Sequence, residues 1–204
     1  MFNMDPAHQL VSYLVRHGEL TDMGVWDAWS DLGLSEEGKT QANAAARWLS
    51  FERLGRAICS DVPRTAQTAQ YLMETGAVVC PYLSCDPNLR PWMVGDFTGK
   101  EKTVERRADF QKYIDNPALP VPGGESLDQF HQRIQVIFQY IGTPYDGKPT
   151  VLFVHNSVLK TLMGLETMKE AVSPGGVVGA YMDESGELSF EVLLGEISSE
   201  KGVS

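Results

Sequence analysis

Hydrophobic and polar positions follow two kinds of pattern along the 204-residue chain. Short apolar runs containing β-branched residues predict buried strands at 11–15, 57–59, 78–80 and 151–154. Apolar residues recurring every three or four positions predict amphipathic helices over 35–49, 63–74, 126–141 and 157–165. Two later apolar stretches, 179–182 and 189–194, flank Asp183-Glu184-Ser185-Gly186 and predict a closing hairpin.

Helix-start signals support this pattern. Ser35 precedes Glu36 and Glu37, which suits an N-cap followed by acidic residues in the first turn. Ser126 and Gln129 have the spacing of a capping box. Strands that alternate with helices predict an α/β fold, specifically a single-domain three-layer sandwich around a mostly parallel central sheet, over residues 1–204.

The segment from about 95 to 124 departs from the alternating pattern. It mixes glycine, proline and charged residues, with a polar stretch at 100–113 that has helical character. Such a segment is typical of an excursion over one face of a domain, and we expect it to be lid-like. Trp26, Trp29, Trp92 and Phe97 either line a pocket near it or serve as packing anchors.

Composition excludes several classes of function. A net charge of −10 and a pI near 4.8 disfavour binding to nucleic acid or an anionic membrane. No apolar stretch approaches 20 residues, and the N-terminus lacks the features of a signal peptide. Cys59, Cys80 and Cys85 fit neither a metal-binding spacing nor a paired disulfide framework. We therefore expect a cytoplasmic protein without a metal.

Three of the predicted strands end in residues that bind anions. The first ends in Arg16-His17-Gly18, the second in Ser60 with Arg64 shortly after it, and a later one in His155-Asn156. Ligands bind beyond the carboxyl ends of parallel strands, so these side chains are expected to meet at one edge. Two imidazoles and two guanidiniums gathered there would be costly without an anion among them. Phosphate matches the charge and the planar fork of arginine.

An imidazole in such a pocket can attack phosphorus and form a phosphohistidine. The guanidiniums would stabilise the charge on the equatorial oxygens during transfer. No phosphate-binding loop of the G-x-x-x-x-G-K-[ST] type is present, which disfavours a nucleoside triphosphatase. No HxH spacing or carboxylate cluster accompanies the histidines, which disfavours a metal site.

Ordered motifs over about residues 11–160 resemble the histidine phosphatase superfamily, the phosphoglycerate mutase-like proteins. The motifs are Leu14-Val15-Arg16-His17-Gly18-Glu19, Leu34-Ser35-Glu36-Glu37-Gly38, the segment from Cys59 to Ala69, the loop from Leu89 to Gly99, Gly123-Gly124-Glu125-Ser126 and Val154-His155. The resemblance implies the phosphoglycerate mutase-like fold and no organic cofactor. It also implies that His17 is the nucleophile and that Arg16, Arg64, His155 and the backbone amide of Asn156 bind the phosphoryl group.

One position departs from the family pattern. Pro91 stands where the family's glutamate general acid is expected, and proline cannot donate a proton. Asp96 and Glu125 are the nearest candidate acids by motif, although each also suits a structural position, in a tight turn and near a helix start respectively. A substrate with a good leaving group would need no acid.

The sequence thus predicts a phosphomonoesterase that hydrolyses a small phosphorylated substrate through phospho-His17. Two alternatives stay open. One is a protein phosphohistidine or phosphotyrosine phosphatase, because labile leaving groups suit an acid-poor site. The other is a non-catalytic phosphate-binding protein that lost its general acid. A homodimer is compatible with the sequence, which carries no legible trace of the oligomeric state.

Overall fold

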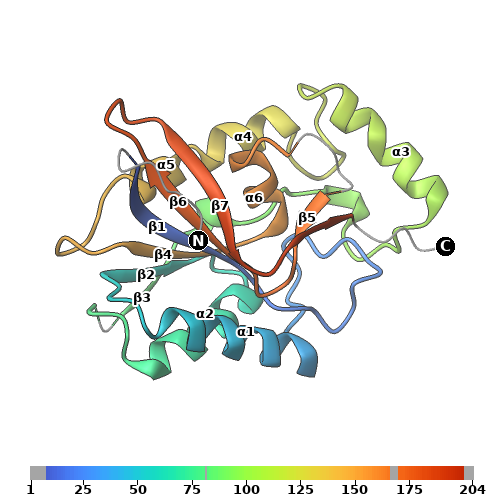
Figure 1. Cartoon of the computed structure of the whole chain (residues 1–204). Coiled ribbons are helices and arrows are strands. Elements are labelled where there is room, and N and C mark those ends of the chain that lie inside the picture. The colour runs from blue at the N-terminus through green and yellow to red at the C-terminus, as the bar shows by residue number, and fades with distance from the viewer. Residues whose placement is uncertain (1–7, 81, 166–169, 200–204) are drawn as a thin grey trace.

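A six-stranded sheet forms the centre of the protein, whose computed structural model describes residues 8–80, 82–165 and 170–199 (Figure 1). Its strand order is β3-β2-β4-β1-β6-β7. The strands are β1 (Gln9–Arg16), β2 (Arg56–Cys59), β3 (Leu83–Cys85), β4 (Thr150–Val154), β6 (Val177–Met182) and β7 (Leu188–Leu194). The first four are parallel to one another, and β6 and β7 add antiparallel strands at one side. A separate two-stranded sheet pairs β5 (Glu170–Val172) with β8 (Ile197–Ser199).

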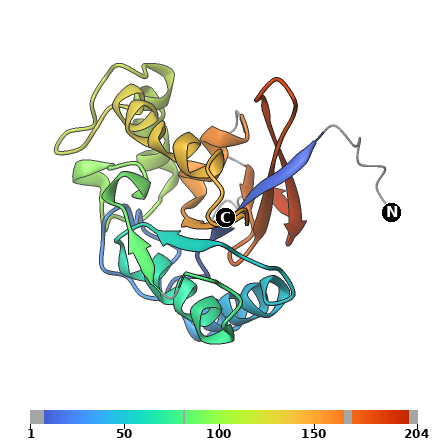
Figure 2. The same ribbon diagram turned by 90° about the vertical axis from the view of Figure 1, so that its left-hand side faces the viewer.

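Helices cover both faces of this sheet. One face carries α1 (Glu36–Leu49) and α2 (Pro63–Thr75); α4 (Leu127–Ile134), α5 (Val136–Ile141) and α6 (Asn156–Leu162) cover the other, as Figures 1 and 2 show together. The helix α3 (Val104–Asp115) lies on the side of α4 and α6, farther out from the sheet. This is the predicted α/β three-layer fold, and the sheet is mostly parallel as expected.

Alternation along the strands separates two hydrophobic cores. Tyr13 and Val15 of β1 pack with the α1 and α2 side, whereas Leu14 between them packs with the opposite side. The backbone after β1 approaches the first turn of α1 very closely, where Gly18 meets Gly38. A Cβ atom at Gly18 would lie 2.2 Å from the Gly38 carbonyl oxygen, so only glycine fits. The turn after β1 is therefore held directly against α1.

Two sequence predictions of secondary structure are wrong. The run at 78–80 is not a strand: Val78 forms only an isolated bridge with Leu54, and the edge strand is β3 at 83–85. The segment that pairs with Ala57–Cys59 of β2 is 83–85, which lies a few residues after the apolar run at 78–80. The helix expected over 126–141 is broken at Gln135, whose N–H donates to Gln132 O three residues back. The capping box at Ser126 and the hairpin of β6 and β7 are confirmed.

The 95–124 segment contains a 3₁₀ turn at Gly95–Phe97 and the helix α3. The helix begins at Val104 after the Thr103 cap, later than the polar stretch suggested. An aromatic cluster fixes the segment to the body of the protein, with centroid separations between 5.0 and 6.1 Å among Trp26, Trp92, Phe97, Phe110 and Tyr113. These rings belong to, or pack against, the hydrophobic core that contains Leu14. Trp26, Trp92 and Phe97 are therefore packing anchors.

The pairing of β2 with β3 generates a prediction about the thiols. Cys59 and Cys85 are directly paired residues, and their Sγ atoms lie 3.1 Å apart. Cys85 is exposed and Cys59 buried. We expect hydrogen peroxide to oxidise Cys85 and the Cys59 thiol then to displace water, giving a disulfide with the loss of two hydrogens. Mass spectrometry of the alkylated protein tests this, with Cys80→Ser as the control that keeps the bond. Failure to form it in the native protein would contradict the pairing.

Candidate functional site

The register of the central strands brings the predicted residues to one edge of the sheet. Arg16 pairs with Val154 and Cys59 pairs with Phe153, so β1, β2 and β4 end side by side. The next residues are also tied together: His17 N–H donates to Val154 O at 3.2 Å and Ser60 N–H to Phe153 O at 3.2 Å. Arg16, His17, Arg64 and His155 are all buried, with exposed fractions of 7%, 4%, 0% and 1%.

The imidazole of His17 is fixed in one orientation and one tautomer. Its Nδ1 lies 2.8 Å from the carbonyl oxygen of Gly18. A carbonyl only accepts hydrogen bonds, so Nδ1 carries the proton and Nε2 carries the lone pair. The ring centroid of His155 is 5.2 Å away. The nitrogen with nucleophilic character therefore belongs to a ring held beside the second histidine.

Ser60 orients His155. The Nε2 atom of His155 lies 3.0 Å from Ser60 Oγ, and that hydroxyl also accepts a hydrogen bond from Val62 N–H at 3.1 Å. Within the described residues, the buried Nδ1 atom of His155 has no hydrogen-bond partner. Burying such a group without a partner costs about 1–3 kcal/mol. A ligand oxygen would offset that cost.

Arg64 is held from the 26–30 loop. One terminal nitrogen donates to Ser30 O at 3.2 Å; the other donates to Ala28 O and pairs with the Asp27 carboxylate at 2.9 Å. Its Nε atom is buried and has no partner among the described residues. On the other side of the site, Arg16 donates to Val172 O. The arrangement leaves an arginine N–H and an imidazole nitrogen for an anion.

The charge balance of the site favours anion binding. Burial, followed by the charges of Arg64 and Arg16, lowers the pKa of His17 well below its ordinary value. Burial and the neighbouring Arg64, His17 and Arg16 lower the pKa of His155 in the same way. Both imidazoles are therefore neutral near pH 7, which keeps the His17 lone pair available beside two guanidiniums.

Comparison with known families agrees with this geometry. The model of the histidine phosphatase superfamily (branch 1) matches residues 12–171. That match covers most of the chain and includes every strand end described above. The chain belongs to the histidine phosphatase superfamily.

Relatives within the superfamily include mutase-like proteins and phosphatases. The chain is 31% identical over 163 residues to phosphoglycerate mutase-like protein 4 of Arabidopsis thaliana, covering 73% of this chain and 67% of that protein. It is 33% identical over 141 residues to the fructose-2,6-bisphosphatase TIGAR of Xenopus tropicalis, covering 63% of this chain and spanning about half (48%) of TIGAR.

Solved structures show the same fold. A mycobacterial glucosyl-3-phosphoglycerate phosphatase complexed with VO3 matches with a TM-score of 0.74 at 21% identity, covering 92% of this chain and all of that one. The alpha-ribazole phosphatase of Shigella flexneri matches with a TM-score of 0.72 at 20% identity, covering 90% and 95%. At these identities the likeness concerns the fold alone.

The described residues contain neither a membrane-spanning helix nor a candidate metal-binding cluster. None of the helices in that part of the chain has the length and hydropathy needed to cross a membrane. Over the same residues, no group of three or more histidine, cysteine or acidic side chains is arranged to hold a metal ion.

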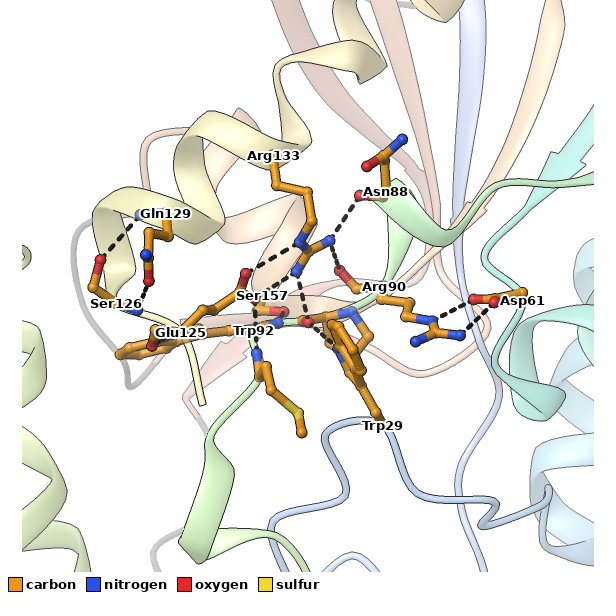
Figure 3. Close-up of polar contacts among 12 residues, drawn as sticks. Trp29, Asp61, Asn88, Arg90, Trp92, Glu125, Ser126, Gln129, Arg133 and Ser157 are labelled. Carbon is orange, nitrogen blue, oxygen red and sulfur yellow. Dashed lines mark hydrogen bonds and ion pairs between the residues drawn. The ribbon is translucent and has the colours of Figure 1, made fainter. Parts of the chain in front are cut away.

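The loop in which the family resemblance places a general acid is held by Arg133 (Figure 3). From α4, this guanidinium donates to the carbonyl oxygens of Asn88, Arg90 and Pro91 at 2.8–3.1 Å. It also holds Glu125 through both carboxylate oxygens, at 2.6 and 3.2 Å. Pro91 is buried and its carbonyl oxygen accepts a second hydrogen bond from Trp29 Nε1 at 2.9 Å.

The two acids named from the sequence lie in different surroundings. Besides pairing with Arg133, Glu125 accepts a hydrogen bond from Met93 N–H at 2.9 Å, so its carboxylate ties α4 to the loop. Asp96 is exposed, in the turn where its oxygen faces Gly123. Asn156 opens α6 directly after His155, so its backbone N–H faces the strand end.

Sequence reasoning missed Asp27 and Arg133. Asp27 belongs to no motif, and Arg133 reads as an ordinary basic residue in the last turn of a helix. What marks both residues is their contact in space with motif residues, Arg64 for Asp27 and Pro91 for Arg133. That contact is visible only in the folded chain. Arg90 was also missed: it pairs with Asp61 through two bonds of 2.6 and 2.5 Å and lies over the Trp29 ring.

The lowered histidine pKa values predict acid sensitivity. Unfolded histidines titrate near pH 6.5, so below that pH the unfolded chain binds protons that the folded site excludes. The free energy of unfolding is therefore highest, as far as these histidines affect it, above about pH 6.5. It falls as the pH decreases, by up to about 1.4 kcal/mol per pH unit for each histidine. Urea unfolding at several pH values tests this. His17→Gln should flatten the slope by about that amount, and an unchanged slope would contradict the burial of a neutral His17.

The Arg133–Glu125 pair predicts a second stability effect. Arg133→Met should destabilise the protein by about 2–4 kcal/mol, because a largely buried carboxylate loses its partner. Adding Glu125→Gln should recover part of that loss, since the unpaired charge is removed. Thermal or urea unfolding of Arg133→Met, Glu125→Gln and the double variant measures the coupling. Additive effects would show that the pair does not act as a unit.

Proposed function

We propose that this superfamily member is a phosphomonoesterase that hydrolyses a small phosphorylated substrate through a phosphohistidine on His17. The observation that carries the proposal is the fixed tautomer of His17, whose Nδ1–H is committed to Gly18 O. That bond leaves the Nε2 lone pair for attack on phosphorus, beside two guanidiniums and a neutral second imidazole.

The other buried groups have complementary roles in this proposal. Arg64 Nε–H and His155 Nδ1 would bind equatorial oxygens of the phosphoryl group, which supplies the partners they lack among the described residues. Arg16 and the backbone amide of Asn156 would complete the site from β1 and α6. His17 Nε2 displaces the leaving oxygen, and water then cleaves the N–P bond and releases phosphate.

The superfamily includes mutases as well as phosphatases. A mutase is less favoured, because Pro91 stands where the family resemblance places the general acid. A phosphatase that acts on labile phosphohistidine or phosphotyrosine is the second candidate, because such leaving groups need little protonation. Activity on phosphopeptides compared with small phosphate monoesters separates the two.

Labelling distinguishes an enzyme from a phosphate-binding protein. Wild-type protein mixed rapidly with para-nitrophenyl phosphate should release a burst of nitrophenol and carry an acid-labile phosphoryl group. His17→Ala should lose the label and reduce kcat by about 10³-fold or more. His131→Ala, which removes an imidazole on α4, is the matched control and should keep both. Vanadate binding without turnover or label in the wild type would overturn the proposal in favour of a binding protein.

A further inference from the structure

The 26–30 loop places a carboxylate against the phosphate-binding arginine. Asp27 Oδ2 lies 2.9 Å from a terminal nitrogen of Arg64, and 27% of the Asp27 side chain is exposed. Arg64 itself is fully buried. Asp27 is therefore positioned at the boundary between the buried site and solvent, where a leaving group must depart.

The same loop lies against the position of the missing acid. Trp29, two residues after Asp27, donates from Nε1 to the Pro91 carbonyl oxygen at 2.9 Å. Figure 3 shows the Trp29 ring reaching this loop from below, opposite Arg133. One short segment thus contacts both Arg64 and the residue that replaces the family's glutamate.

The loop is held rigidly enough to position a reacting group. Trp26 packs on Phe97 and Phe110 and exchanges backbone hydrogen bonds with Gly99 and Lys100, at 2.8 and 3.0 Å. Ala28 adopts a left-handed backbone with φ of 34°, which a non-glycine residue rarely accepts, while its carbonyl oxygen binds Arg64. Strained backbone of this kind persists where the surrounding contacts enforce it, and it clusters at functional sites.

The other carboxyl groups near the site are engaged elsewhere. Both oxygens of Glu125 bind Arg133. Asp61 follows Ser60, but Arg90 occupies both of its oxygens. The Glu19 carboxylate accepts a hydrogen bond from Ser35. Asp96 is exposed and faces Gly123. Asp27, in contrast, contacts the Arg64 side chain directly.

From these contacts we propose that Asp27 is the general acid that protonates the leaving group, in place of a glutamate at position 91. The inference rests on the proposed phosphatase function. When a phosphate ester occupies Arg64, the Asp27 carboxylate shares that guanidinium with a second anion. In the proposed reaction the ester binds as its monoanion, and its proton passes to the Asp27 carboxylate before the P–O bond breaks.

The proposed reaction has two steps. The His17 Nε2 lone pair forms the N–P bond while the P–O bond breaks, and its electron pair goes to the leaving oxygen. That oxygen takes the proton from the Asp27 carboxyl and departs as an alcohol. In the second step water attacks phosphorus, the N–P electron pair returns to Nε2, and the Asp27 carboxylate accepts the proton from water.

The dependence of rate on the leaving group tests the proposal. Asp27→Asn preserves the shape of the side chain and a hydrogen-bonding group for Arg64, yet cannot donate a proton as an acid. We expect kcat/KM to fall about 10²–10⁴-fold for alkyl and phenyl phosphates, whose leaving groups need protonation. For 2,4-dinitrophenyl phosphate, whose leaving group needs none, the fall should be within a few-fold. Asp31→Asn, an exposed carboxyl in the same region, is the matched control and should leave the series unchanged.

Two outcomes would overturn the assignment. An equal loss across all leaving groups would make Asp27 only an anchor for Arg64, and no loss would remove it from the mechanism. Phosphoryl labelling of His17 in Asp27→Asn with the dinitrophenyl ester keeps these outcomes separate from failure of the proposed function. Such labelling persists if only the acid is misassigned and is absent in every variant if His17 is not the nucleophile.

Discussion

The parallel alignment of β1, β4 and β2 is the constraint on which the site depends. Backbone hydrogen bonds fix the register so that the residues after Arg16, Cys59 and Val154 emerge at the same level. Each ladder bond is modest in free energy, but together they leave the strand ends no freedom to slide. Because apolar side chains fill both faces below this edge, the polar groups are confined to it.

That confinement concentrates positive charge and hydrogen-bond donors in a buried space. Arg64 is fully buried although its desolvation is costly, and the Asp27 carboxylate and two carbonyl groups of one loop offset part of that cost. The two imidazoles respond by remaining neutral, since protonation would add charge to a site already cationic. The same conditions would favour a phosphoryl group as ligand and His17 as nucleophile in the proposed reaction.

Rigidity around the site comes from a second network that contains no nucleophile. Arg133 and Glu125 join α4 to the loop before Trp92, and Trp29 joins that loop to the segment that holds Arg64. The loop is therefore firmly held, although Pro91 stands where the family resemblance places a glutamate. The backbone carbonyl of Pro91, rather than its side chain, connects the two segments.

The sequence by itself determined the fold class, the strand ends and the four buried residues of the site. The spacing of apolar residues shows which face of each strand or helix is buried. The four site residues can be recognised because they lie in motifs, at strand ends or in the helix turn just after one: Arg16, His17, Arg64 and His155. It misplaced the edge strand at 78–80, because three apolar residues do not reveal which stretch of an extended segment will pair. Only the tertiary structure brought Asp27 to Arg64 and Arg133 to Pro91. Each contact joins a helix residue to a loop residue 37 or more positions away in the chain. Neither the period nor the local propensity of either segment carries information about such a partner.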